Sequence, residues 1–321
     1  MKTLNYILLL LTTAIVCNSQ PVPAPDENIP YLMTFGKKAA TSWGDDDFVQ
    51  VFFFQIPKNY AMPFFIRVYD PDCGGVVDEL GGVFDTKTVF SVYGGKGAYS
   101  HKDAQSVNPE GNYKSGNMLA TKTFDADPKY DQQWYTFGPF NPTDGEYIDM
   151  FQSNIFKIII EGIEGDDGNL YRFYLSTQMN ANKPIEGGNA FAFEYTFRMY
   201  DDPNQVSHIY PYIDNRTISV KISNFDWDSD GFLRIITVAR NGKMLEASAE
   251  NNWVTTDFKV FNEELNTSFD IQFIKKKVPP VKNNNVVIFV TNQYGENLPF
   301  YTIPIGGVPK YKYKIGVTKE P

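Results

Sequence analysis

The stretch Ser42–Gly75, SWGDDDFVQVFFFQIPKNYAMPFFIRVYDPDCGG, contains two aromatic, apolar runs, and a group of aspartates stands outside each of them. The runs, Phe48–Ile56 and Pro63–Tyr69, have the length and the aromatic and β-branched content of strands. A short turn separates them, and a hairpin is the most common link between neighbouring strands of an all-β protein. We therefore expect the two runs to pair as a hairpin.

Strand-length apolar runs recur along the rest of the chain, between turns rich in Gly, Asp, Asn and Pro. Phenylalanine and tyrosine, with 26 and 20 copies, suit the faces of packed sheets. The sequence predicts an all-β fold of two β-sandwich domains, jelly-roll-like at the N-terminus and immunoglobulin-like at the C-terminus. Besides the first two runs, the expected strands are Thr88–Tyr93, Met118–Phe124, Gln133–Phe137, Ile155–Ile160, Leu170–Ser176, Phe191–Tyr200, Thr217–Ile222, Leu233–Ala239, Thr256–Phe261, Ser268–Phe273, Asn285–Thr291 and Tyr311–Gly316.

A polar, proline-containing segment, YDDPNQVSHIYPYIDNRT, follows the first series of strands and indicates the junction between the domains. The expected organisation is a signal peptide over 1–19, a proline-rich tether over 20–30, the jelly-roll-like sandwich over 31–201 and the immunoglobulin-like sandwich over 202–321.

The N-terminal segment has the pattern of a secretory signal peptide. One cation, Lys2, precedes an apolar run from Tyr6 to Val16 that is too short to span a bilayer. We expect cleavage after Ser19 and a secreted protein, periplasmic or at the outer cell surface, with no transmembrane segment. Lipid anchoring at Cys17 is the alternative, although Val16 is larger than the residue that usually precedes a lipidated cysteine.

The formal charge of −9 disfavours nucleic acid and anionic lipid as partners and favours cations or neutral ligands. Apart from Cys17, the chain has a single cysteine, Cys73, so no disulfide forms within the mature chain. We expect Cys73 to be a buried small hydrophobic residue.

The aspartates around the opening stretch predict a calcium site. If the hairpin forms, Asp47 lies opposite Asp70 and Asp45 opposite Asp72, and a glycine-rich loop carries Asp78 towards them. Opposed carboxylates repel one another and raise one another's pKa, and a cation relieves the repulsion. Calcium takes six to eight oxygen ligands. The expected ligands are Asp45, Asp47, Asp70, Asp72 and Asp78; the alternative is ordinary turn chemistry in exposed loops.

Two further acidic segments have structural interpretations. In DWDSDG, residues 226–231, the spacing resembles the start of a calcium loop, but we expect Phe225 and Trp227 to point inward while Asp226 and Asp228 face water. In EGIEGDDGNLYRF, residues 161–173, we expect a hairpin turn at Asp167 and Gly168.

Catalytic motifs are scarce. The histidines, His101 and His208, lie in polar segments, and the sequence contains no nucleophile elbow, zinc-protease motif or P-loop. A glycosidase needs two carboxylates across a cleft, and no pair stands out in the sequence. The tryptophans offer a sugar-stacking platform as one interpretation and core packing as the other; they are Trp43, Trp134, Trp227 and Trp253.

The runs DDFVQVFFFQIP, PFFIRVYDPD and FKIIIEGIEGDDGNLYRFYLS resemble strands of secreted bacterial jelly-roll modules, such as pre-peptidase C-terminal domains and calcium-supported carbohydrate-binding modules. This resemblance covers about half of the chain. The signal peptide followed by Gln20, with Asn-, Tyr- and Phe-rich strands, also resembles exported proteins of Bacteroidota. The resemblance implies an accessory domain that binds calcium, sugars or protein surfaces without catalysing a reaction.

We therefore expect a non-catalytic binding or adhesion protein with calcium-stabilised loops, which recognises a protein or glycan at the cell envelope. A polysaccharide hydrolase with an unidentified carboxylate pair is one alternative, and a structural subunit of an envelope assembly is another. A deep cleft with two carboxyl groups about 5–9 Å apart favours the hydrolase.

Overall fold

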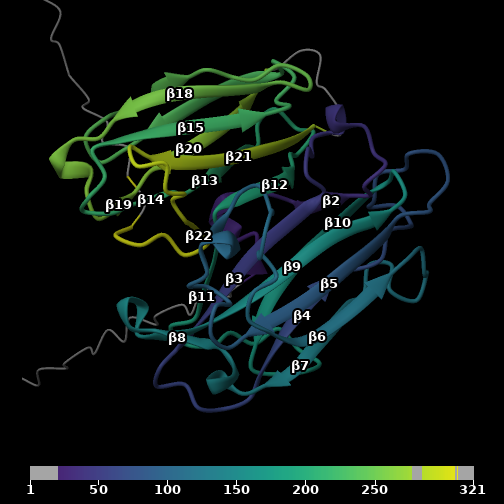
Figure 1. The fold of residues 1–321 in the computed structure, drawn as a ribbon. Coiled ribbons are helices and arrows are strands. Elements are labelled where there is room, and N and C mark those ends of the chain that lie inside the picture. The colour runs from purple at the N-terminus through teal and green to yellow at the C-terminus, as the bar shows by residue number, and fades with distance from the viewer. Residues whose placement is uncertain (1–20, 277–283, 308, 310–321) are drawn as a thin grey trace, which may run out of the picture.

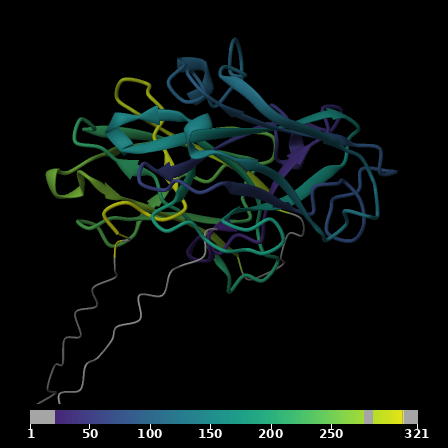
Figure 2. The same ribbon diagram turned by 90° about the horizontal axis from the view of Figure 1, so that it is seen from below.

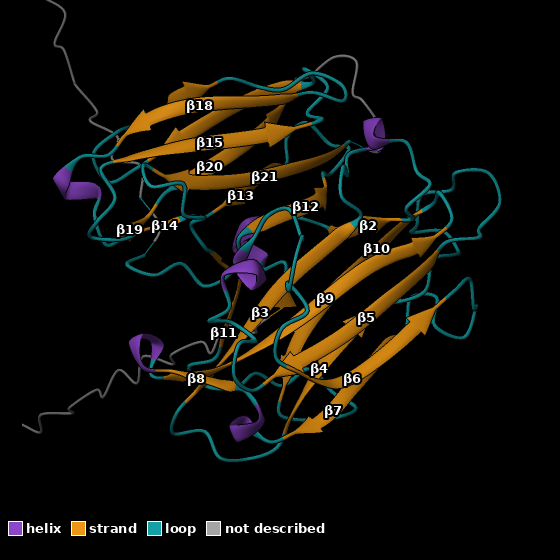
Figure 3. Ribbon diagram, in the orientation of Figure 1, coloured by secondary structure: helices purple, strands orange, loops and turns teal. Residues whose placement is uncertain are grey.

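The computed structural model describes residues 21–276, 284–307 and 309, and strands make up most of its regular structure (Figure 1; Figure 3). The strands are β1 (Pro21–Val22), β2 (Tyr31–Phe35), β3 (Val49–Pro57), β4 (Phe64–Tyr69), β5 (Lys87–Gly94), β6 (Asn117–Phe124), β7 (Trp134–Phe140), β8 (Glu146–Ile148), β9 (Ser153–Glu164), β10 (Gly168–Ser176), β11 (Asn189–Ala192), β12 (Glu194–Arg198), β13 (Val206–Ile209), β14 (Tyr212–Ile213), β15 (Ser219–Phe225), β16 (Gly231–Ile236), β17 (Lys243–Leu245), β18 (Trp253–Lys259), β19 (Thr267–Ser268), β20 (Asp270–Lys275), β21 (Asn285–Asn292) and β22 (Phe300–Tyr301). Short 3₁₀ helices lie between them: η1 (Pro25–Glu27), η2 (Thr41–Trp43), η3 (Lys102–Gln105), η4 (Pro142–Asp144), η5 (Asp149–Phe151) and η6 (Asn262–Glu264).

The described strands form antiparallel sheets of nine, seven, four and two strands. The nine-stranded sheet has the order β18-β15-β21-β12-β2-β10-β4-β7, with β1 beside β10. The seven-stranded sheet has the order β22-β11-β3-β9-β5-β6, with β8 beside β9, and the four-stranded sheet has the order β13-β20-β16-β17. Figure 2 shows the resulting halves side by side, with the N-terminal strands at one end and the C-terminal strands at the other.

Aromatic side chains fill the sandwich of the N-terminal half. The ring of Phe52 on β3 lies 5.6 Å from that of Phe173 on β10, and the ring of Phe64 on β4 lies 4.9 Å from that of Phe156 on β9. All four are fully buried. These contacts place the β3, β5 and β9 sheet face to face with β4 and β10, which is a β-sandwich.

The C-terminal half packs in the same way. Phe197 on β12 contacts Phe273 on β20, with ring centroids 5.3 Å apart, and the buried Trp227 contacts Phe273 at 5.5 Å. The C-terminal part of the nine-stranded sheet therefore covers the four-stranded sheet. The expected all-β fold built from sandwiches is confirmed.

The nine-stranded sheet is continuous across the expected domain boundary between residues 201 and 202. β12 lies before this boundary and pairs with β21 after it, from Glu194 opposite Phe289 to Arg198 opposite Asn285. On the inner face of β12, Tyr195 contacts Phe52 of the first sandwich at 5.4 Å, while Phe197 contacts the second sandwich. The two halves thus share one sheet and one hydrophobic core; the division into two domains stays a prediction.

The predicted hairpin of β3 and β4 is wrong. β3 pairs with β9 and β11, whereas β4 pairs with β10 and β7, so residues 58–63 carry the chain from one sheet to the other. The predicted hairpin at Asp167 and Gly168 is wrong for the same reason, because β9 and β10 also lie in opposite sheets. The left-handed glycine of that crossover is Gly165, with φ +78°.

Residues 21–30, expected as a proline-rich tether, are instead packed onto the first sandwich. β1 pairs with β10, and Val22 and Glu27 are fully buried. The expected signal peptide over 1–19, Cys17 and the expected strand Tyr311–Gly316 lie outside the described residues. Within the described part of the chain, no helix combines the length and apolar character needed to cross a membrane.

Candidate functional site

The two aspartate groups expected to share one ion lie on either side of the start of β10. Asp45 accepts hydrogen bonds from the backbone N–H groups of Phe35, at the end of β2, and Phe48, at 3.3 and 2.9 Å. Asp70 directly follows β4. Because β10 runs between β2 and β4, both groups reach the same end of the sandwich without forming the opposed pairs expected from a hairpin.

The first group joins Asp45 and Asp47 to Asp46 and to Glu194 of β12. Burial raises the pKa of Asp45 to about 7, although backbone N–H groups that donate to its carboxylate lower it in part. Burial, followed by repulsion from Asp45, raises the pKa of Asp47 well above its usual range, and burial with repulsion from the aspartates does the same to Glu194. Asp46 accepts a hydrogen bond from the indole of Trp253 at 2.8 Å. Asp45 thus shapes the turn that leads into β3.

The second group joins Asp70 and Asp72 to a residue that the sequence did not single out, Asp131. Asp70 and Asp72 are 0% and 1% exposed and accept backbone hydrogen bonds from Gln132 and Asp127, at 2.8 and 3.2 Å. Burial raises the pKa of Asp70 to about 6 and that of Asp72 to about 7, and repulsion from Asp131 contributes to both shifts. The pairing of β4 with β7 brings the β6–β7 loop to this position.

Asp78 lies beside the second group, but both of its oxygens have backbone partners. It accepts hydrogen bonds from the N–H groups of Leu170 at 2.6 Å and Gly74 at 2.7 Å. Burial raises its pKa well above the usual range, and Asp70 and Asp72 add to the shift. Asp78 therefore ties the β4–β5 loop to β10.

A third acidic group lies at the crossover from β9 to β10. Asp85, Asp166 and Asp167 bring ligand oxygens within 4.8 Å of one another, the one such group of three among the described residues. Asp167 already accepts hydrogen bonds from the N–H groups of Gly81, Asp85 and Thr86, at 2.8, 2.8 and 3.1 Å. Its carboxylate therefore organises the 81–86 loop, and Asp85 is exposed.

The DWDSDG segment turns inward. Phe225 and Trp227 are buried as expected. Asp226, expected to face water, is only 2% exposed, because its backbone is left-handed at φ +56° and its carboxylate accepts a hydrogen bond from the N–H of Asn251. Burial raises the pKa of Asp226 to about 7. This aspartate holds a loop together within the C-terminal half.

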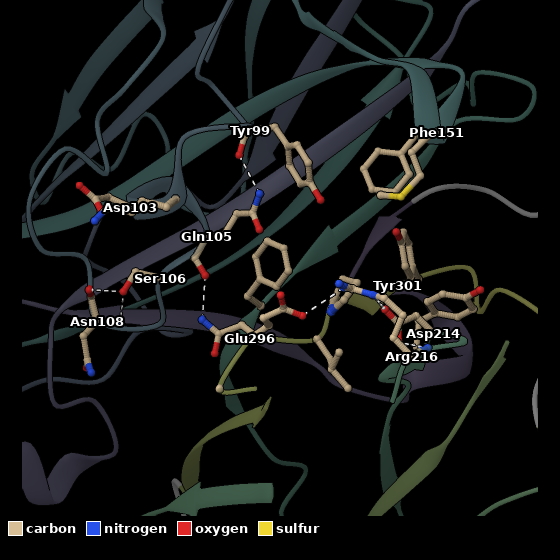
Figure 4. A pocket seen from close by; sticks show the side chains of 18 of the residues that line it. Tyr99, Asp103, Gln105, Ser106, Asn108, Phe151, Asp214, Arg216, Glu296 and Tyr301 are labelled. Atoms are coloured by element: carbon tan, nitrogen blue, oxygen red, sulfur yellow. Dashed lines mark hydrogen bonds and ion pairs between the residues drawn. The ribbon is translucent and has the colours of Figure 1, made fainter. Parts of the chain in front are cut away.

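A cleft of about 1320 Å³ lies between the two halves. Four rings that line it belong to one aromatic cluster: Tyr99 of the β5–β6 connection, Phe151 of η5, Tyr212 of β14 and Tyr301 of β22. Figure 4 shows the rings of Tyr99 and Phe151 facing the cleft across from polar side chains of the C-terminal half. The cleft is therefore lined by aromatic rings from both halves.

Polar groups are interspersed with these rings. Arg216 donates to Asp214 and to Glu296, at 3.1 Å each, and this triad faces the cleft in Figure 4. Asn297 donates to the backbone oxygen of Gln105 at 2.8 Å and links the two halves. Burial acts to raise the pKa of Asp214, but hydrogen bonds from Thr217 and Arg216 outweigh it and lower the pKa. Both carboxylates of the triad are therefore acceptors paired with a cation.

Glu146, at the start of β8, positions one wall of the cleft. Its carboxylate accepts hydrogen bonds from the backbone N–H groups of Gly97 and Tyr99 at 2.9 and 2.7 Å, and from both the N–H and the hydroxyl of Ser100. Burial alone would raise the pKa of Glu146, but these donors lower it. The carboxylate thus holds the turn that presents the Tyr99 ring.

We expect Glu146→Gln to lower the free energy of unfolding by about 1–3 kcal/mol at pH 7, because the amide turns its own donors towards buried N–H groups. The folded pKa of Glu146 is lowered, so its contribution is present above the pKa of the unfolded chain and is lost as the pH falls through the folded value. Urea unfolding of the wild type and the variant at pH 7 and below pH 4 measures this. If the difference in their free energies of unfolding is as large in acid as at pH 7, the prediction is contradicted.

The tryptophan platform proposed from the sequence does not form at the cleft. Trp227 is a fully buried core residue, and neither it nor Trp43, Trp134 or Trp253 lines the cleft. The rings that do line it are tyrosines and phenylalanines from loops and short strands whose neighbours in space are distant in sequence. Cys73 is buried, as expected.

Fold and cleft together define a β-sandwich protein with an aromatic-lined cleft between two halves that share one sheet. No family model matches this chain, and a search of curated proteins returns no match.

Proposed function

We propose that this chain is an exported, non-catalytic binding protein that recognises a glycan at the cell envelope through the cleft between its halves. The observation that carries the proposal is the combination of aromatic rings with charged and amide groups around a volume of about 1320 Å³. A sugar ring has an apolar face, which packs on aromatic rings, and a rim of hydroxyl groups, which amides, carboxylates and guanidinium groups bind. The volume accommodates several sugar units.

Binding is favoured over hydrolysis by the state of two of the carboxylates that line the cleft, Asp214 and Glu296; Asp103 and Glu110 also line it. A glycosidase needs one carboxylic acid that stays protonated, with a raised pKa, opposite an ionised partner. Asp214 and Glu296 instead flank the same guanidinium, and the pKa of Asp214 is lowered. This pair is suited to holding hydroxyl groups rather than to acid catalysis.

The test is a glycan microarray followed by calorimetry with the best ligand. We expect Tyr212→Ala, which removes an aromatic ring from the cleft, to weaken binding at least about tenfold. The matched control is Tyr294→Ala, because Tyr294 is 68% exposed and does not line the cleft. Equal losses in both variants, or cleavage of the bound glycan, would contradict the proposal.

A further inference from the structure

At one end of the first sandwich, the β4–β5 loop, the β6–β7 loop and the start of β10 carry oxygens that have no hydrogen-bond partner among the described residues. These are Oδ2 of Asp70, Oδ1 of Asp72, Oδ1 of Asp131 and Oδ1 of Asn169. Each of these atoms is buried. Such oxygens are costly to bury unless a donor or a cation satisfies them.

The orientation of the side chains is fixed by their other oxygens. Asp70 Oδ1 accepts a hydrogen bond from the N–H of Gln132, and Asp72 Oδ2 accepts one from the N–H of Asp127. The second oxygen of each carboxylate has no hydrogen-bond partner among the described residues. The Asp131 carboxylate lies against Gly75, where a Cβ atom would stand 2.4 Å from Oδ1. Gly75 therefore allows the third carboxylate to approach the loop that carries Asp72.

Asn169 adds a neutral oxygen to the group. Its side chain is fully buried and donates from Nδ2 to the backbone oxygen of Pro71, between Asp70 and Asp72, at 2.9 Å. This bond directs Nδ2 towards Pro71, so Oδ1 points away from Pro71 and has no donor among the described residues. A buried amide oxygen without a donor requires a partner, and a cation is one group that can supply it.

Among the described residues, no salt bridge joins a cation to Asp70, Asp72 or Asp131. Arg172 lies opposite Tyr69 on the neighbouring strand β10, and its guanidinium stacks on the rings of Tyr69 and Tyr31, at 4.5 and 4.9 Å from their centroids. An additional positive charge would therefore stabilise the two loops.

We propose that Asp70, Asp72, Asp131 and Asn169 bind a divalent cation of the calcium type. The ligands are carboxylate oxygens on two loops and one amide oxygen at the start of β10, oxygen donors that suit calcium, and water completes its six to eight ligands.

This set differs from the one expected from the sequence. It shares Asp70 and Asp72 with the predicted set and adds Asp131 and Asn169. It does not include Asp45, Asp47 and Asp78. Its oxygens are spread more widely than those of the Asp85, Asp166 and Asp167 group.

The test is calcium titration of the EDTA-treated full-length protein, followed by thermal unfolding and terbium luminescence. We expect the Tm to rise by at least about 5 °C when calcium exceeds its Kd a hundredfold. Tyr69 and Trp134 stand at the adjoining strand ends, with rings 5.3 Å apart, and should sensitise emission from terbium bound at this site.

Three variants locate the ion. Asp131→Asn removes one charge at a partly exposed position, so we expect it to fold, to keep or slightly raise the Tm without calcium, and to lose most of the calcium response. Asp85→Asn and Asp47→Asn are the controls at the other acidic groups, and both should retain the full response. Absence of any calcium shift in the unmodified protein, or loss of the shift in a control but not in Asp131→Asn, overturns the proposal.

Discussion

Replacing Arg198 with methionine is expected to lower the free energy of unfolding by about 3–5 kcal/mol. Arg198 lies on β12, and its guanidinium pairs with Glu79 of the β4–β5 loop and donates from Nε to Asn285 of β21 at 2.6 Å. Its side chain is 12% exposed and that of Glu79 is 15% exposed. Without the arginine, Glu79 keeps a charge in a largely buried site with only Asn285 to satisfy it.

Removing one partner of the Glu79–Arg198 ion pair is expected to lower the free energy of unfolding strongly, whereas the intact pair itself adds little to it. Burial raises the pKa of Glu79 and lowers that of Arg198, and in each case the attraction of the partner offsets only part of the shift. We therefore expect the double variant Glu79→Gln, Arg198→Met to recover most of the stability lost by Arg198→Met. Chemical denaturation of the wild type, both single variants and the double variant measures the coupling energy. A loss below about 1 kcal/mol in Arg198→Met would contradict the expected buried charge.

The same set of Glu79 and Arg198 variants tests the contact between the two halves. Asn285 also donates to the backbone oxygen of Trp43 at 2.8 Å, and the backbone of Glu79 pairs with Gly168. One polar cluster thus connects η2, the β4–β5 loop, β12 and β21. We expect Arg198→Met to leave a single cooperative unfolding transition, because the shared core also joins the halves.

Glu27→Gln is expected to remove the part of the protein's loss of stability that Glu27 causes as the pH rises towards 8. Glu27 is fully buried, and burial raises its pKa to about 8, although a 2.6 Å hydrogen bond from the N–H of Ala24 opposes the shift. In the unfolded chain its pKa is near 4.5. The folded state therefore keeps a proton that the unfolded state releases between these values.

The sign follows from this difference. The contribution of Glu27 is fully present below about pH 4.5 and is lost as the pH rises, by roughly 1.4 kcal/mol per pH unit, until the carboxyl group ionises near pH 8. Glutamine resembles the protonated acid and does not ionise. Between pH 6 and pH 8 the wild type should lose on the order of 2 kcal/mol more than Glu27→Gln.

Unfolding curves across this pH range check the prediction, and Asp26→Asn is the matched control. Asp26 is the exposed neighbour of Glu27 in η1, and its charge is the smallest of the named contributions to the pKa of Glu27, so its replacement should shift the pH profile only slightly and keep its slope. Asp45 and Asp226 also have raised pKa values, but both variants retain them, and the comparison isolates Glu27. Parallel profiles for the wild type and Glu27→Gln would show that Glu27 is ionised in the folded protein.

The sequence alone determined the fold class and most strand positions. Aromatic and β-branched residues in short runs, separated by Gly, Asp, Asn and Pro, predicted strands that the structure places within a few residues, such as β3, β5, β6 and β21. This works because alternation and turn chemistry are local properties. The inward orientation of Phe225 and Trp227 was predicted for the same reason.

Only the tertiary structure decided which strands are neighbours, and with them the composition of every site. An alternating pattern states which face of a strand is buried but not which strand lies beside it. β3 therefore lies next to β9 rather than β4, Asp131 reaches Asp70 through the pairing of β4 with β7, and β12 extends one sheet into both halves. The cleft depends on loops from both halves, and their meeting follows from packing across that shared sheet.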